Sequence, residues 1–183
     1  MDWFPFGRKK RQQKVQALAL YSAIVDMSRN ADLFQACQIP DTVDGRFDVL
    51  SLHLFLVLRR VKKEQGQDDF ADEVASVFAT DMDRNLREMG VGDLSVGKHV
   101  KKMSAAFMGR FMAYDKALDD QDHSQLAAAL KRNIFRDAPV DPTLIETLKI
   151  YTLTAYDLLK QTTLDQLLAA DLPTVPVHQS GAK

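Results

Sequence analysis

Apolar residues recur along most of this chain at steps of three and four, the spacing that places them on one face of an α-helix. The clearest series runs from Val96 to Leu118 at steps of 4, 3, 4, 4, 3 and 4, with Asp93 ahead of it as a candidate N-cap. Further series predict helices over about 13–29, 47–63, 68–89, 122–134 and 141–158, and short helical pieces near 33–37 and after Thr163. No repeat or linker divides the chain, so we expect an all-α protein with one compact domain of about six to seven helices.

The segment 47–63 is ambiguous, because alternate leucines from Leu50 onward also follow the period of a strand. Its length favours a helix. Asp48 in the first turn and basic residues in the last turns match the helix macrodipole. Phe55 and Val57 make the segment apolar on nearly every side, so we expect it to be the central buried helix of the fold.

Residues 1–14 join aromatic side chains to a basic cluster. The aromatic residues are Trp3, Phe4 and Phe6, and the basic ones are Arg8, Lys9, Lys10, Arg11 and Lys14. Near an anionic membrane such a cluster contributes about 1 kcal/mol per basic residue, and aromatic rings favour the interface. A disordered basic tail and contact with RNA on a ribosome are the alternatives. Pro5 and Gly7 argue against one continuous amphipathic helix, so any anchor is expected to be short.

Residues 15–172 are expected to form the folded domain. Its first helix has an apolar stripe at helical spacing, which we expect to face the core: Val15, Leu18, Tyr21 and Val25. After the last short helix, Pro173, Pro176 and neighbouring polar residues predict a disordered tail over 173–183.

Composition excludes several classes of protein. Lys and Arg total 24 against 25 for Asp and Glu, so we expect no partner held by bulk charge, such as DNA. With 46% hydrophobic residues, the chain can bury a core. Cys37 is the only cysteine, which excludes an internal disulfide and fits a reducing compartment. The longest apolar run, 54–58, is far short of the roughly 20 residues that span a bilayer, so a cytosolic or peripheral protein is expected.

Residues 92–99 nearly match the phosphate-binding loop G-x-x-x-x-G-K-[ST], but His99 stands where the pattern needs a hydroxyl group. The pattern also needs a strand ahead of the loop, whereas residues 84–89 continue a helical series. We interpret the segment as a tight turn between helices, in which Gly90 and Gly92 supply positive φ. Nucleotide hydrolysis is therefore not expected.

The histidines and the cysteine offer no catalytic constellation. His53 lies among leucines, where a lone histidine is more often a hydrogen-bonded core residue than a ligand. His99, His123 and His178 show no E-x-x-H pairing, so neither a metal site nor a cofactor is expected. Cys37 lacks an identifiable base, and there is no G-x-S-x-G elbow. A binding protein is the default expectation, and an all-α enzyme or haem binder using His53 or His99 is the alternative.

Two blocks of residues go beyond generic helices. The first is 41–48, D-T-V-D-G-R-F-D, and the second is 86–97, L-R-E-M-G-V-G-D-L-S-V-G, followed by F-M-G-R at 107–110. These blocks resemble the signature of the ubiquinol-cytochrome c chaperone family. The residues that carry the resemblance are Asp41, Asp44, Gly45, Arg46, Phe47, His53, Arg87, Glu88, Met89, Gly90, Gly92, Asp93, Gly97, Gly109 and Arg110. Met108 departs from the family pattern, which implies a tyrosine there.

The resemblance implies an assembly chaperone of the cytochrome bc1 complex without catalytic turnover. In mitochondria this family binds newly made cytochrome b, associates with the ribosomal tunnel exit and works with a small partner factor. Because Asp2 follows Met1 and no Ser- and Arg-rich transit peptide is present, we expect a bacterial member at the cytoplasmic face of the inner membrane. A generic membrane-peripheral adaptor is the alternative.

A client such as cytochrome b is apolar, so its binding surface should combine an adaptable apolar groove with a cationic rim. Five methionines lie in or between the helices that flank the glycine turn: Met82, Met89, Met103, Met108 and Met112. Methionine-rich surfaces adapt to varied partners, although methionine at helical spacing is also common in cores. The candidate client-binding residues are Arg87, Lys98, Lys101, Lys102, Met103 and Met108. Solvated lysines are the alternative for the basic members.

The first block also has a structural interpretation. Asp44 is a candidate N-cap for the central helix, and Gly45 eases the turn into it. Arg46 stands near Asp41 and Asp48 as a candidate ion-pair partner. Arg46 and Arg110 are equally candidates for buried partners of carboxylates, in which case their loss would unfold the protein.

Overall fold

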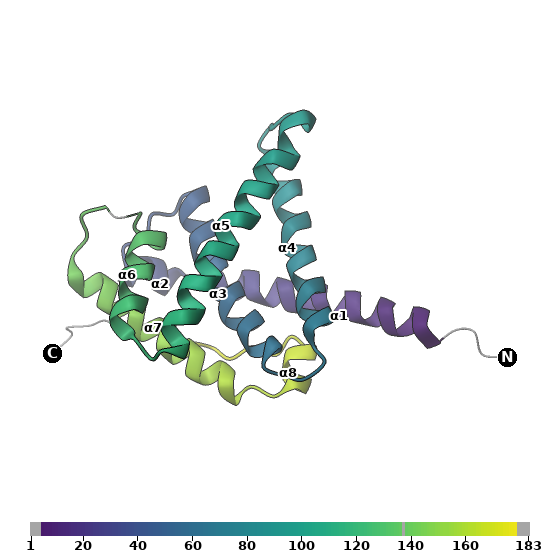
Figure 1. Ribbon diagram of the computed structural model, residues 1–183. Helices are drawn as coiled ribbons and strands as arrows, with labels where there is room; N and C mark the ends of the chain where they lie inside the picture. The colour runs from purple at the N-terminus through teal and green to yellow at the C-terminus, as the bar shows by residue number, and fades with distance from the viewer. Residues whose placement is uncertain (1–4, 137, 179–183) are drawn as a thin grey trace.

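The structure is a computed structural model that describes residues 5–136 and 138–178, and these residues form eight helices (Figure 1). The helices are α1 (Pro5–Ser28), α2 (Ala31–Ala36), α3 (Val43–Lys62), α4 (Asp68–Glu88), α5 (Asp93–Asp119), α6 (His123–Ile134), α7 (Pro142–Gln161) and α8 (Leu164–Leu168). α2 and α8 are short, with 6 and 5 residues. No strand occurs in the described part of the chain, and the all-α prediction is confirmed.

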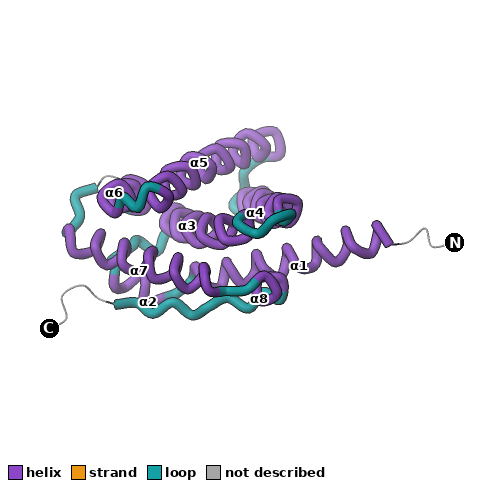
Figure 2. Tube along the Cα trace, turned by 60° about the horizontal axis from the view of Figure 1, so that its bottom comes forward, coloured by secondary structure: helices purple, strands orange, loops and turns teal. Residues whose placement is uncertain are grey.

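α3 runs through the middle of the molecule, and α1, α4, α5 and α7 pack around it (Figures 1 and 2). Every residue from Asp48 to Arg59 is buried. The prediction of a central buried helix is therefore confirmed, and the strand alternative for its leucines is excluded. A helix enclosed on all sides needs no polar face, which explains why its apolar pattern lost the helical period.

A cluster of aromatic rings joins α3, α4 and α5. The ring of Phe55 meets that of Phe111 edge to face with centroids 5.0 Å apart, and Phe78 lies 5.3 Å from Phe107. Such pairs add about 0.5–1.5 kcal/mol each beyond the burial of their area. They hold α4 and α5 as an antiparallel pair, whose connecting turn projects from the body of the molecule (Figure 1).

α1 begins at Pro5, so the prediction that Pro5 and Gly7 interrupt the helix is wrong. Proline fits the first helical position because its missing N–H would have no helical partner there. One glycine in a helix costs only about 1 kcal/mol, which the longer helix tolerates. The first turns of α1 project beyond α4 and expose Arg8 to Arg11 (Figure 2). Trp3 and Phe4 lie outside the described residues.

The face of α1 that packs on the core differs in part from the prediction. Tyr21 is buried as expected, but Val15 and Leu18 are exposed, and their place is taken by Leu20 and Ile24. Both faces of this helix carry apolar residues, so the pattern alone does not separate them. Packing of α1 against α3 and α4 determines which of its faces is buried.

The chain after α8 is ordered further than predicted. Residues 169–178 run back toward the end of the molecule where α2 and the start of α7 lie (Figure 2). Val175 is buried in the core, and Val177 packs against it. The prediction of a disordered tail is thus wrong for 173–178, because these valines bury apolar area. Residues 179–183 lie outside the described part of the chain.

Side-chain caps begin several helices. Asp122 accepts hydrogen bonds from the backbone N–H groups of Ser124 and Gln125, and Asp141 caps α7. Thr163 and Gln166 form a capping box at α8. Asp93 is not the N-cap of α5, since Gly92 holds that position and Asp93 lies in the first turn, where its charge suits the macrodipole.

Candidate functional site

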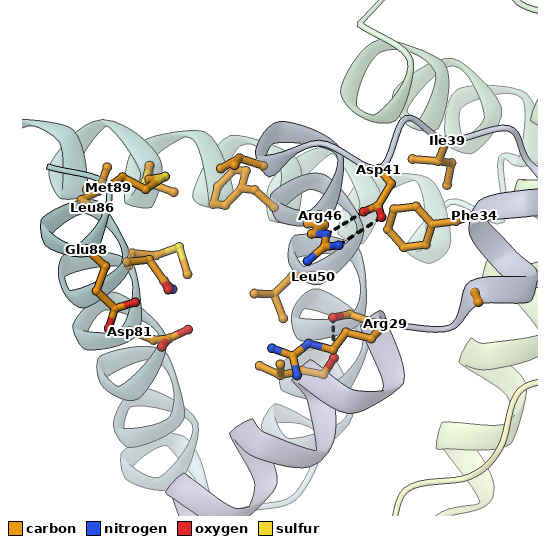
Figure 3. Close-up of a pocket in the computed structure, with 18 of the residues that line it drawn as sticks. Arg29, Phe34, Ile39, Asp41, Arg46, Leu50, Asp81, Leu86, Glu88 and Met89 are labelled. Atoms are coloured by element: carbon orange, nitrogen blue, oxygen red, sulfur yellow. Dashed lines mark hydrogen bonds and ion pairs between the residues drawn. The ribbon is translucent and has the colours of Figure 1, made fainter. Parts of the chain in front are cut away.

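A groove of about 760 Å³ opens between the C-terminal end of α1, α2, the start of α3 and the C-terminal half of α4 (Figure 3). α5 contributes Met103 to it. Its apolar lining includes Val25, Phe34, Phe47, Leu50, Met82 and Leu86. This volume lies within the usual range of binding pockets, and the mostly apolar lining suits an apolar ligand or an apolar segment of another chain.

The charged residues of the groove have both signs. Arg46 donates two hydrogen bonds to the Asp41 carboxylate, at 2.6 and 3.0 Å, and Asp81 accepts one from the Tyr21 hydroxyl at 2.8 Å. Arg29 and Glu88 complete the set (Figure 3). The expected cationic rim is therefore a mixed rim in which most charges already have partners.

The five methionines divide between two places. Met82, Met89 and Met103 line the groove, as expected of an adaptable apolar surface. Met108 and Met112 point to solvent from α5 and do not line it. Different faces of α5 thus separate Met103 from Met108 and Met112, although the sequence predicts one shared surface.

The lysines of α5 lie apart from the groove as well. Lys98, Lys101 and Lys102 are exposed on α5 and are absent from the groove lining. Arg87 is held at the surface by hydrogen bonds to Asp83 and Asp93. Of the predicted client-binding residues, the structure brings only Met103 to the groove.

The glycine turn is a connection between helices, as predicted, rather than a phosphate-binding loop. Gly90 adopts a φ of +84°, and the Gly90 N–H donates to the carbonyl of Arg87. Gly92 has a φ of −63°, so the prediction of a positive φ there is wrong. A helix precedes the turn, and Gly97 and Lys98 lie inside α5.

The two family blocks meet at a buried carboxylate. Asp48 of the first block is fully buried and accepts a hydrogen bond from Arg110 of the second block at 2.6 Å. Arg136, from the segment after α6, donates to the other carboxylate oxygen at 3.1 Å. Desolvation raises the pKa of Asp48, against the opposing effect of the two arginines. This cluster ties α3, α5 and the α6–α7 connection together.

The cluster also supports the groove wall. The guanidinium carbon of Arg110 lies 5.3 Å from the centroid of the Phe47 ring, and that ring lines the groove. Arg110 is thus the buried partner that the sequence suggested, whereas Arg46 is exposed and pairs with Asp41. The family residues near Asp48 therefore have a structural role in shaping the groove.

The N-cap of α3 is Thr42, whose hydroxyl accepts a hydrogen bond from the Gly45 N–H at 3.1 Å, so the prediction of Asp44 as the cap is wrong. Asp44 instead lies in the first turn and pairs with Arg136 at 3.1 Å. Gly45 is needed for a close approach. A Cβ atom there would lie 2.1 Å from the carbonyl oxygen of Pro40.

We expect Gly45→Ala to destabilise the protein by about 1–3 kcal/mol, because the new methyl group would clash with the backbone carbonyl of Pro40, which cannot rotate away as a side chain could. Chemical unfolding with urea measures this loss. Gly97→Ala is the matched control, since nothing lies within 4 Å of a Cβ atom there and alanine favours a helix. The two substitutions should change stability in opposite directions, and a neutral result at Gly45 would contradict the close approach.

His53 is a buried core residue, as predicted. The Nδ1–H group donates to the carbonyl of Val49 at 2.8 Å, and Nε2 accepts from the Tyr151 hydroxyl at 2.7 Å. Both ring nitrogens are therefore occupied, which leaves neither free to bind haem iron. His99 is exposed on α5. Within the described residues no group of three His, Cys, Asp or Glu side chains is placed to hold a metal ion.

Several residues of the site escaped the sequence analysis. Arg136 reaches Asp48 across 88 positions, and Tyr151 reaches His53 across 98. Phe34 brings α2 into the groove. No local pattern marks these contacts, because each depends on how distant helices pack.

The family described as ubiquinol-cytochrome C chaperone matches residues 35–175 of the chain. The match includes α3, α4 and α5 and therefore most of the groove wall. A crystal structure described as the Cbp3 homolog from Brucella abortus is similar at 39% sequence identity, with a TM-score of 0.82. The similarity covers 97% of this chain and 98% of that one.

Two mammalian proteins are similar to the chain over 148 residues, or 80% of its length. Each is called ubiquinol-cytochrome c reductase complex assembly factor 1, one from Mus musculus and one from Homo sapiens, and each is 30% identical to the chain. The matched region covers 50% of the mouse protein and 49% of the human one. The chain thus spans about half the length of these relatives.

Proposed function

The chain belongs to the ubiquinol-cytochrome c chaperone family, and from this premise we propose that it is an assembly chaperone that binds newly made cytochrome b during biogenesis of the bc1 complex. The observation that carries the proposal is the family match over residues 35–175, which includes the helices around the groove. The names of the mammalian relatives, as assembly factors of the reductase complex, support the same function.

The groove supplies a mechanism for holding such a client. Membrane-protein segments outside the bilayer expose apolar side chains, and an apolar groove shields them from water. Methionine side chains adapt to different shapes because they are unbranched and flexible. The paired charges at the rim bring little net attraction, so binding stays reversible and the client can be released to the complex.

We place this activity at the cytoplasmic face of the inner membrane, with the protein bound peripherally. The structure offers no described helix with the length and hydropathy for crossing a bilayer. The exposed basic residues Arg8 to Arg11, at the projecting end of α1, support contact with anionic lipid or with a ribosome. A small partner factor belongs to the same proposal.

We expect Val43→Glu to reduce capture of cytochrome b at least about tenfold, because a carboxylate on the groove wall must lose water or stay unpaired when the client binds. Val43 is 61% exposed and lies in the first turn of α3, where an acidic residue suits the macrodipole, so the fold should survive. The measurement is a pull-down of tagged protein from gently solubilised cells, with cytochrome b quantified by mass spectrometry.

Val15→Glu is the matched control, since Val15 is 62% exposed on α1 and does not line the groove. It introduces the same charge at an equally exposed valine and should leave capture unchanged. Equal capture by wild type and Val43→Glu would remove the groove from the mechanism. Absence of cytochrome b from the wild-type sample would refute the proposed function itself.

A further inference from the structure

One face of α5 combines exposed apolar residues with lysines. At steps of 4, 3, 4, 3 and 4 it carries Leu94, Lys98, Lys101, Ala105, Met108 and Met112, which we call the outer stripe. All six residues are exposed, and the side chains of Met108 and Met112 are 54% and 66% exposed. Residues with this spacing share one face of a helix, so the stripe runs along most of α5.

The charge of this face is uniformly positive. Between Asp93 and Asp115 the chain has no acidic residue, and Asp93 itself is held by Arg87. Within the described residues no ion pair joins Lys98, Lys101 or Lys102 to a carboxylate. The lysines lie in the second and third turns of α5, beyond the first turn where the macrodipole acts, so in the described part of the chain neither an ion pair nor the helix dipole stabilises them.

We propose that the outer stripe of α5 binds the surface of an anionic lipid bilayer, with the helix lying along the membrane. Exposed apolar side chains can enter the headgroup layer, while flexible lysines reach the lipid phosphates. The turn between α4 and α5 projects from the body (Figure 1). Leu94, the second residue of α5, is fully exposed beside it.

The shape of the face favours lipid over a peptide. A bound peptide helix needs a groove that buries its apolar side. The groove of this protein is lined by the opposite side of α5, through Met103, and no outer-stripe residue belongs to it. A single convex helix with alternating lysine and apolar residues matches a planar, anionic and partly apolar surface.

The inference rests on the proposed function only in the premise that the protein works at a membrane. It adds a second membrane contact, on α5, to the one proposed for the basic end of α1. The client groove remains free in this arrangement, because its lining residues lie on other faces of the bundle. The surface thus allows simultaneous binding of lipid and client.

The first experiment measures binding to vesicles of phosphatidylcholine and phosphatidylglycerol in equal amounts, and to vesicles of phosphatidylcholine alone. We expect the wild type to bind only the anionic vesicles. The variant K98Q/K101Q/K102Q should lose about fivefold in partition coefficient per lysine, or about 100-fold in total. Lysine contributes to binding through its charge near the anionic surface, so raised salt should weaken wild-type binding too.

The matched control is K62Q/K63Q/K160Q, which removes the same charge from exposed positions on α3, α7 and the segment after α3. It should bind as the wild type does. A second comparison is R8Q/K9Q/K10Q/R11Q, which tests the end of α1 separately. If only the α1 variant loses binding, the α5 proposal is overturned while peripheral membrane association stands. If the wild type itself does not bind, both are overturned.

An environment-sensitive dye reports insertion directly. Met108→Cys offers an exposed thiol for labelling, whereas Cys37 is buried and burial raises its pKa to about 12. We expect the emission of the dye to shift to the blue on adding anionic vesicles. Ala128→Cys, exposed on α6, is the control and should show no shift. An unchanged emission spectrum of the dye at position 108 would overturn the proposal. The proposal would also be overturned if K98Q/K101Q/K102Q lost capture of cytochrome b but kept binding to vesicles.

Discussion

Asp48→Ala is expected to destabilise the protein by about 3–5 kcal/mol, the cost of leaving a buried charge without its partner. Asp48 is fully buried, and the side chain of its partner Arg110 is nearly so. Removing the carboxylate strands Arg110 in an apolar environment beside Phe47. Urea unfolding measures the loss, and a low yield of folded protein in cells should accompany it.

Two further variants distinguish the effect of burying the Asp48 carboxylate from the effect of losing a carboxylate at the surface. Asp48→Asn keeps the volume and two acceptor sites, so its loss of stability should be smaller than that of the alanine variant. Asp41→Ala removes the carboxylate of the exposed pair with Arg46, and its unfolding midpoint should stay close to that of the wild type. Equal losses at Asp41 and Asp48 would contradict the assigned role of burial.

This result bears on how the family residues are interpreted. A protein with substituted Asp48 or Arg110 would capture less cytochrome b simply because less of it is folded. Val43→Glu avoids this problem, since Val43 is exposed and makes no buried pair. Client capture is therefore best tested with substitutions on the groove surface such as Val43→Glu. Substitutions of Asp48 test the stability of the fold.

Acid should destabilise the protein through His53, with an expected loss of about 3 kcal/mol between pH 7 and pH 4. Burial lowers the pKa of His53 from an ordinary value of 6.5 to about 4. Between these two values the unfolded chain binds more protons than the folded one, so stability is fully present above 6.5 and falls as the pH decreases. The physical reason is that the buried imidazole must stay neutral.

The measurement is urea unfolding of the wild type and His53→Gln at a series of pH values. Glutamine can form hydrogen bonds but does not titrate, so the variant should lose less stability than the wild type on acidification. At pH 7 the variant should be less stable, because glutamine does not reproduce both hydrogen bonds of His53. The raised pKa of Asp48 contributes with the opposite sign and is common to both proteins. Parallel curves for the two proteins would show that His53 does not titrate as assigned.

Much of the helical structure follows from local physics that the sequence displays. The steps of three and four in α5, and the caps Asp122, Asp141 and Thr163, act within one or two turns of the chain. Such interactions do not depend on the rest of the fold, so they can be read in order along the sequence. The all-α class is predictable for this reason, whereas the central position of α3 is predictable from its apolar residues on nearly every side.

Predictions that required a choice between faces or ends were less successful. The sequence predicts Val15 in the core, although Leu20 packs there, and it predicts Val175 in a disordered tail, although Val175 is buried. In both cases the local apolar content allows either outcome. The partner surfaces decide it, because the gain comes from area removed from water by distant helices.

The same division holds for the candidate site. The all-α class, the family residues and the stretch 94–114, which carries lysine and methionine but no acidic residue, are all visible in the sequence. Two features follow from the packing of the helices: Met103 faces the groove while Met108 faces solvent, and Asp48 pairs with both Arg110 and Arg136. Contacts across dozens of residues are set by packing of whole helices, which no short stretch of sequence encodes.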